Sequence, residues 1–140
     1  MPTPSDQHRG GVRGQRGSAI VEFTLVSLLF FSLVFGLVEF GRALFAYSTI
    51  ASAAREGVRY ATVHGSESKH PATTDDISSY VRTKAVGLNN VVVAVTWLPT
   101  NTPGSTVRVQ VRYTFTSLLP RLLAFKTIPM SSTSFMVIVH

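Results

Sequence analysis

The feature that most constrains this chain is a continuous stretch from Gly17 to about Val63 whose character changes halfway. Residues 23–38 contain no charged side chain, and the 21 residues from 18 to 38 contain only Glu22. As a helix, that segment extends about 31 Å, roughly the thickness of the hydrocarbon core of a bilayer. The stretch therefore predicts a transmembrane helix over residues 18–38, rather than the buried helix of a soluble protein.

The residues before this segment predict its orientation. Arg9, Arg13 and Arg16 precede the apolar run, and only Asp6 opposes them. By the positive-inside rule, the N-terminus stays in the cytoplasm and the residues from about 39 onward lie outside the membrane. Residues 1–17 are expected to form a basic cytoplasmic leader, disordered up to residue 16 because proline, glycine and polar residues dominate it.

Glu22 is the unusual residue of the apolar segment, because a carboxylate within a membrane span is costly. One interpretation places it in the first helical turn, close enough to the headgroups to reach them. The other depends on cleavage after Gly17, which would make Ser18 the new N-terminus. The α-amine of Ser18 and the carboxylate of Glu22 would then share one depth in the lipid and neutralise each other.

The pattern Gly17-Ser18-Ala19-Ile20-Val21-Glu22-Phe23 resembles the class III leader of type IV pilins and pseudopilins. In those proteins a prepilin peptidase cuts after the glycine, and a glutamate stands at the fifth mature position. The resemblance implies processing between Gly17 and Ser18, with Glu22 and Phe23 acting in neutralisation of the N-terminus and in assembly. Phe23 is a departure, because the best-known members of this pilus class have tyrosine there.

Two further motifs make the resemblance more specific: GLVEFGRALF over residues 36–45 and AAREGVRYA over residues 53–61. With the leader, they are similar to the TadE-like family of the tight-adherence (Flp) pilus system over about a third of the chain. The resemblance implies a minor pseudopilin or membrane-anchored pilus assembly component with a pilin-like fold. Its implied partners are the inner membrane, the prepilin peptidase and other pilus or pseudopilin subunits.

Residues 39–63 are expected to continue the helix as an amphipathic extension. Apolar residues recur there at spacings of three and four and predict one buried face: Leu44, Tyr47, Ala51, Ala54, Val58 and Ala61. This face is expected to pack on the protein's own sheet, or on helices of neighbouring subunits.

The charged residues of the extension suggest two contact sites. Glu39 and Arg42 stand three apart and can pair, as can Glu56 and Arg59. With Arg55, these residues are candidates for contacts with a subunit or partner, local ion pairs being the alternative.

Residues 64–140 are expected to form an exported α+β domain, with a loop, a second helix and three strands. Thr73 or Thr74 is expected to cap the helix, with Asp75 and Asp76 in its first turn, and Gly87 or Asn89 to end it. The strands are expected to cover residues 91–98, 106–116 and 131–139. The first strand, apolar on both faces, is predicted to be central or covered. Residues 117–129 are expected to form a short helix or packed crossover, with membrane contact through Leu122, Leu123 and Phe125 as the alternative.

In the strand over residues 106–116, alternation predicts one buried face: Val107, Val109, Val111, Tyr113 and Phe115. Arg108 and Arg112 share the opposite face, which this strand's aromatic residues avoid. A nucleic-acid surface would place aromatic rings among the arginines. We therefore expect no nucleic-acid partner, although the net charge is +6.

No motif of known chemistry is present. The chain has no cysteine, which excludes disulfides and thiolate metal sites. There is no phosphate-binding glycine loop, no HExxH and no nucleophile elbow. We expect no catalytic activity, no cofactor, no metal and no small-molecule substrate.

The sequence thus predicts an α+β, pilin-like fold in which a long N-terminal helix packs on a small antiparallel sheet. The leading functional hypothesis is a non-catalytic minor pseudopilin or assembly component, anchored once in the bacterial cytoplasmic membrane. Both a position in the pilus and a position at its base are compatible with the sequence. The alternative is an uncleaved, single-pass anchored domain that binds an envelope or pilus partner, and a membrane-tethered enzyme is the weakest hypothesis.

Overall fold

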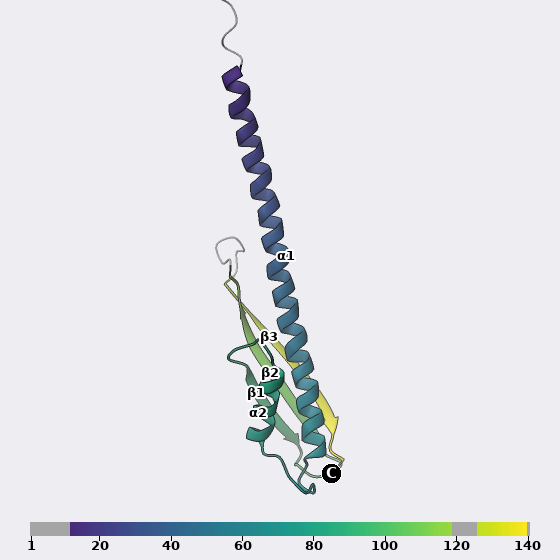
Figure 1. Ribbon diagram of the computed structural model, residues 1–140. Helices are drawn as coiled ribbons and strands as arrows, with labels where there is room; N and C mark the ends of the chain where they lie inside the picture. The colour runs from purple at the N-terminus through teal and green to yellow at the C-terminus, as the bar shows by residue number, and fades with distance from the viewer. Residues whose placement is uncertain (1–11, 119–125, 140) are drawn as a thin grey trace, which may run out of the picture. The chain divides into compact units, whose positions relative to one another are not determined.

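The computed structural model describes residues 12–118 and 126–139. Along the chain it contains α1 (Val12–Val63), α2 (Thr74–Lys84), β1 (Val92–Leu98), β2 (Thr106–Thr116) and β3 (Thr127–Val137), as labelled in Figure 1. The chain divides into two compact units, Met1–Val38 and Glu39–His140, so that α1 contributes residues to both. The fold is α+β, as the sequence predicts.

The described part of the first unit is the N-terminal portion of α1. The helix begins at Val12, so the predicted disorder up to residue 16 is wrong for residues 12–16. Arginine and glutamine are good helix formers, and one intervening glycine costs only about 1 kcal/mol, which the long helix that follows can offset. The prediction for residues 1–11 falls outside the described residues. Large apolar side chains from Ile20 to Val38 are exposed on all sides of this segment.

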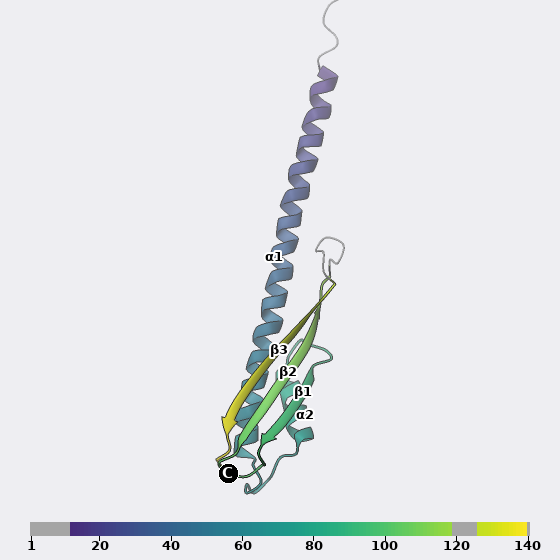
Figure 2. The ribbon, with the colours of Figure 1, turned by 180° about the vertical axis from the view of Figure 1, so that it is seen from behind.

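The second unit contains a three-stranded antiparallel sheet in the order β1-β2-β3. At its centre, Val109 of β2 lies opposite Val95 of β1 and Ser134 of β3. The prediction that the first strand is central or covered is wrong, because β1 is an edge strand with Val92, Ala94 and Thr96 exposed. Both helices pack on one face of the sheet, so an apolar run in β1 cannot be buried on both sides (Figure 2).

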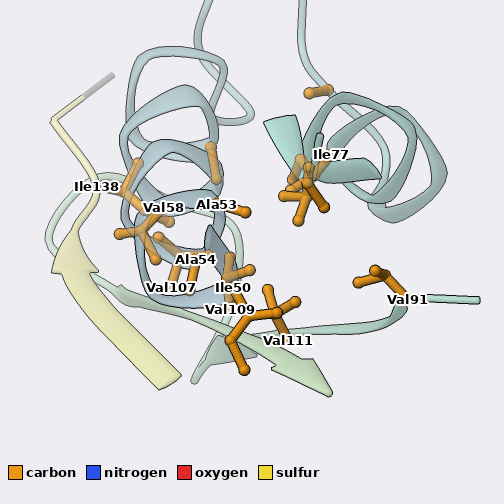
Figure 3. Packing of buried hydrophobic residues seen from close by; sticks show 14 residues of the cluster. Ile50, Ala53, Ala54, Val58, Ile77, Val91, Val107, Val109, Val111 and Ile138 are labelled. Atoms are coloured by element: carbon orange, nitrogen blue, oxygen red, sulfur yellow. The ribbon is translucent and has the colours of Figure 1, made fainter. Parts of the chain in front are cut away.

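The core lies between that sheet face and the two helices (Figure 3). Val107, Val109 and Val111 of β2 are fully buried, which confirms the predicted alternation. They belong to one cluster with Ile50 of α1 and Ile77 of α2. Central strand β2 thus supplies the apolar surface that both helices cover.

The buried face of α1 agrees in part with the predicted one, because Ala54, Val58 and Ala61 are buried as predicted. Leu44 and Tyr47 are 56% and 52% exposed, so their predicted burial is wrong, whereas Ala46 and Ile50 are buried. The buried face consists mainly of small residues: Ala46, Ile50, Ala53, Ala54, Gly57, Val58, Ala61 and Thr62. Small side chains let a helix backbone approach a sheet closely, which a face containing Leu44 and Tyr47 would prevent.

Gly57 marks the closest approach between α1 and its neighbours. A Cβ atom built at this residue would lie 2.4 Å from Cγ2 of Val81 in α2 and 3.2 Å from Cγ1 of Val109 in β2. Glycine in the middle of a helix costs up to about 1 kcal/mol relative to alanine. Close packing explains why this position nevertheless has no side chain.

Helix α2 begins with a capping box, as its sequence indicates. The backbone N–H of Asp76 donates to Oγ1 of Thr73 at 3.2 Å, and the backbone N–H of Thr73 donates to Oδ2 of Asp76 at 2.9 Å. Hydrogen bonds from the Thr73 side chain and backbone hold the pKa of Asp76 below its usual value. The helix ends at Lys84, earlier than predicted, and Gly87 follows with a φ of 78°.

Strand β3 begins at Thr127, earlier than the predicted residue 131, and therefore includes Ile128 and Pro129 from the expected crossover. The predicted membrane contact through Leu122, Leu123 and Phe125 lies outside the described residues. Pro129 is compatible with the strand because an edge strand tolerates a missing N–H.

Candidate functional site

The predicted processing residues lie on α1 in the first unit. Gly17, Ser18, Glu22 and Phe23 are all exposed, and a Cβ atom at Gly17 would meet nothing within 4 Å. Ser18 and Glu22 are four residues apart, so they occupy the same side of the helix, one turn from each other. A new α-amine at Ser18 would therefore begin on the helix face that carries the Glu22 carboxylate.

In the second unit, α1 contacts the end of β2 through a group we call the Glu39 cluster: Glu39, Arg42, Phe115, Ser117 and Leu118. Nη1 of Arg42 lies 2.5 Å from Oε2 of Glu39, which confirms the predicted ion pair. Oε1 of Glu39 accepts a hydrogen bond of 2.7 Å from the backbone N–H of Leu118. The guanidinium carbon of Arg42 lies 5.2 Å from the centre of the Phe115 ring.

The environment of Glu39 favours its charged form. Burial raises the pKa of the carboxyl, since the residue is 4% exposed, but hydrogen bonds from Ser117, Leu118 and Arg42 outweigh this effect. The pKa of Glu39 therefore lies below its usual value. Among the described residues, both carboxylate oxygens have partners within this chain, so the carboxylate fastens α1 to the sheet. The hydrogen bond between Glu39 and Leu118 could not be predicted from the periodicity of the helix, because Leu118 belongs to a distant segment.

The charged motif of residues 55–59 lies on the exposed side of α1. Arg55 and Arg59 are exposed and Glu56 is half-buried, and Nη2 of Arg55 donates to Oγ of Ser52 at 3.1 Å. The predicted pair between Glu56 and Arg59 is wrong: within the described residues, the one ion pair joins Arg42 to Glu39. An exposed helical pair is worth only about 0.3–0.5 kcal/mol, too little to hold two long side chains together.

These residues line one wall of a groove of about 450 Å³, which we call the Arg55 groove. Its walls are Arg55, Glu56, Val58 and Arg59 of α1, and Ser134, Phe135 and Met136 of β3. Oγ1 of Thr62 lies 3.7 Å from the sulfur of Met136, and the guanidinium carbon of Arg108 lies 5.5 Å from the centre of the Phe135 ring. Phe135 thus brings an aromatic ring beside Arg108, which alternation within β2 alone could not reveal.

The residues on the β3 side of this groove are not among the predicted site residues. Phe135 and Met136 are consecutive, so in a strand they point to opposite faces, and one of them must leave the core. The sequence of β3 could therefore have indicated an exposed apolar residue at this point. The proximity of Phe135 and Met136 to Arg55 depends on tertiary packing.

The loop between α1 and α2 is polar and contains His64 and His70, of which His64 makes local contacts. Nδ1 of His64 lies 2.9 Å from the carbonyl oxygen of Tyr60, and the two rings stack with centres 4.2 Å apart. Within the described part of the chain, no three histidine, cysteine, aspartate or glutamate residues are grouped to hold a metal ion.

The described residues define a class of protein: an α+β fold whose N-terminal helix is the one described helix that could span a membrane. The helical segment Gly17–Val63 is long and apolar enough for this, and its most apolar window is entirely unburied in the structure.

Residues 17–59 match the family model described as TadE-like protein, which confirms the resemblance seen in the leader and in the two helical motifs. The match includes every predicted site residue, from Gly17 to Arg59. It suggests a component associated with the Tad pilus. No curated protein matches the chain, and no solved structure does.

Proposed function

We propose that this protein is a membrane-anchored, non-catalytic minor pseudopilin that takes part in assembly of a tight-adherence pilus. The observation that carries this proposal is the TadE-like match over residues 17–59, which lies within a helical segment whose most apolar window is unburied. The Glu39 cluster adds support, because it fastens part of the matched segment to the sheet of the second unit. A protein of this kind acts through helix and domain contacts.

In the proposed mechanism, a prepilin peptidase cuts between Gly17 and Ser18 at the inner membrane. The arginines of the leader keep the N-terminus in the cytoplasm, and the second unit lies outside. The carboxylate of Glu22 then neutralises the α-amine of Ser18, in the same chain or in a neighbouring subunit. An unpaired charge at the centre of a bilayer costs about 2.5–3.5 kcal/mol on insertion scales, and a smaller cost of the same kind near the interface gives the pairing at Glu22 a driving force.

The proposal is tested by replacing Glu22 with alanine in the native host. We expect loss of piliation while the protein still inserts in the membrane, because the change removes a charge that opposes insertion. Glu67→Ala, at an exposed residue of the polar loop, is the matched control and should leave piliation unchanged. Normal piliation with Glu22→Ala would contradict the proposal.

The alternative is an uncleaved anchored binding domain, which the exposed Arg55 groove favours. Intact mass and N-terminal peptide mapping of the protein from its native membrane separate the two. A mature chain that starts at Ser18 supports the pseudopilin. A chain that retains Arg9, Arg13 and Arg16 would make it a permanent anchor and favour the binding domain.

A further inference from the structure

The Arg55 groove lies along a strand edge that is open to pairing. β3 pairs with β2 along its whole length, from Thr127 opposite Thr116 to Val137 opposite Thr106. Among the described strands, none pairs with its other edge. The backbone N–H and C=O groups of a free edge form a template for another extended chain.

The usual protection of an edge strand is missing from the part of β3 that follows Pro129. Residues 130–137 of β3 contain neither a charged residue nor a proline. Phe135, Met136 and Val137 are 58%, 45% and 53% exposed, so an apolar run lies at the open edge. Natural edge strands are commonly shielded by lysine, proline or a bulge, because an unshielded edge attracts other strands. An edge of this composition is suited to a partner strand.

The groove also has a charge that selects its occupant. Arg55 and Arg59 line the groove and lie one helical turn apart on α1. Within the described residues, neither of these two arginines has a carboxylate within 4 Å. Among the described residues that line the groove, Glu56 is the one acid, so the two cations outnumber it. Charge complementarity therefore favours a partner that carries carboxylates.

The spacing of the arginines agrees with an extended ligand. Four residues of helix rise about 6 Å, which is the axial distance between Arg55 and Arg59. Two residues of an antiparallel strand extend about 6.8 Å. Carboxylates two residues apart on one face of a strand therefore have nearly the spacing of the two arginines.

We propose that the Arg55 groove binds an extended acidic segment of another protein, which adds to β3 as a fourth strand. The backbone of the segment pairs with the edge of β3, and carboxylates on alternate residues contact Arg55 and Arg59. The proposal deepens the proposed function by naming a class of partner. It rests on the geometry of the second unit alone, so it can hold or fail independently of processing at Gly17.

The test uses the full chain in phosphatidylcholine nanodiscs and a fluorescent peptide of about nine residues, a typical strand length. Glutamate alternates with threonine and valine in the probe. One control peptide has lysine in place of glutamate, and a second has N-methyl groups on alternate amides to block strand pairing. Fluorescence anisotropy gives the affinities, and amide hydrogen exchange gives the position of binding.

We expect the acidic peptide to bind about tenfold more tightly than either control peptide, and to lose affinity as the salt rises to about 1 M. Bound peptide should slow amide exchange over residues 133–137. The double change Arg55→Glu and Arg59→Glu should weaken binding about tenfold or more. The matched control, Arg82→Glu with Lys84→Glu, alters the charge of α2 equally and should leave the affinity unchanged.

Three results would overturn the proposal. If the α2 variant weakens peptide binding as much as the Arg55→Glu, Arg59→Glu variant does, the affinity depends only on the net charge of the protein. Equal binding of the N-methylated peptide would exclude strand addition. If phosphatidylserine vesicles bind the second unit through Arg55 and Arg59 while the acidic peptide does not bind, the groove recognises lipid headgroups instead. Circular dichroism of each variant confirms that the comparison is between folded proteins.

Discussion

Replacing Gly57 with alanine is expected to destabilise the second unit, although alanine is the better helix former. The added Cβ atom would lie 2.4 Å from Cγ2 of Val81, far inside the usual carbon–carbon contact of about 3.5–4.0 Å. It would also lie 3.2 Å from Cγ1 of Val109. Both valines are in the core, where neither can move without disturbing other contacts.

The size of the effect follows from two opposing terms. Overpacking a well-packed core typically costs about 1–3 kcal/mol. Alanine gains up to about 1 kcal/mol over glycine in a helix interior. Because the contact with Val81 is so short, the cost should lie in the upper part of that range, about 2–3 kcal/mol, and we expect a net loss of about 1–2 kcal/mol in the free energy of unfolding. For a unit of this size, that loss lowers Tm by roughly 4–15 °C.

The measurement is thermal and urea unfolding of the full chain in detergent, followed by circular dichroism. Gly41→Ala is the matched control, because a Cβ atom there meets nothing within 4 Å, and it should not destabilise the protein. Combining Gly57→Ala with Val81→Ala removes the closest contact, so the double variant should be more stable than the sum of the single effects predicts. If Gly57→Ala is as stable as the native chain, the packing argument is refuted.

Glu39→Ala is expected to lower the free energy of unfolding by about 2 kcal/mol, measured by urea unfolding, because the N–H of Leu118 and the guanidinium of Arg42 lose their acceptor. Folding lowers the pKa of Glu39 below its unfolded value of about 4.5. The charged carboxylate therefore stabilises the fold fully above the unfolded pKa, and this stabilisation is lost as the pH falls through the folded pKa. A pH series that compares the native chain with Glu39→Gln should show the difference shrinking in acid, and a constant difference would contradict this. Thr73→Ala should cost about 1 kcal/mol through loss of the helix cap, whereas Thr83→Ala, at an exposed residue inside α2, should cost clearly less.

Local patterns predicted the parts of the fold that depend on local chemistry. The apolar run identified α1, strict alternation identified the buried face of β2, and Thr73 with its following acids identified the start of α2. The Glu39–Arg42 pair was also predictable, because both residues belong to one helix. Each of these features depends on residues within a few positions of one another.

The features that the sequence did not reveal depend on packing between distant segments. The buried face of α1 includes Ala46 and Ile50 in place of Leu44 and Tyr47, because its position is set by packing on the sheet and α2 and not by the number of apolar residues. The exposure of one face of β1 depends on both helices covering the same side of the sheet. The Arg55 groove joins residues of α1 to Phe135, which no periodicity within either element could indicate.

The hydrogen bond between Glu39 and Leu118 has a consequence for the order of synthesis. The two residues are 79 positions apart, so the ribosome adds the donor long after the acceptor has been made. Over that interval, Arg42 is the neighbour that can hold the carboxylate, because it belongs to the same helical turn. Closing a loop of that length costs about 4 kcal/mol in chain entropy, which the β hairpins offset when they form. The local ion pair thus gives the carboxylate a first partner within its own helix, and the partner from residue 118 is added when most of the chain has been made.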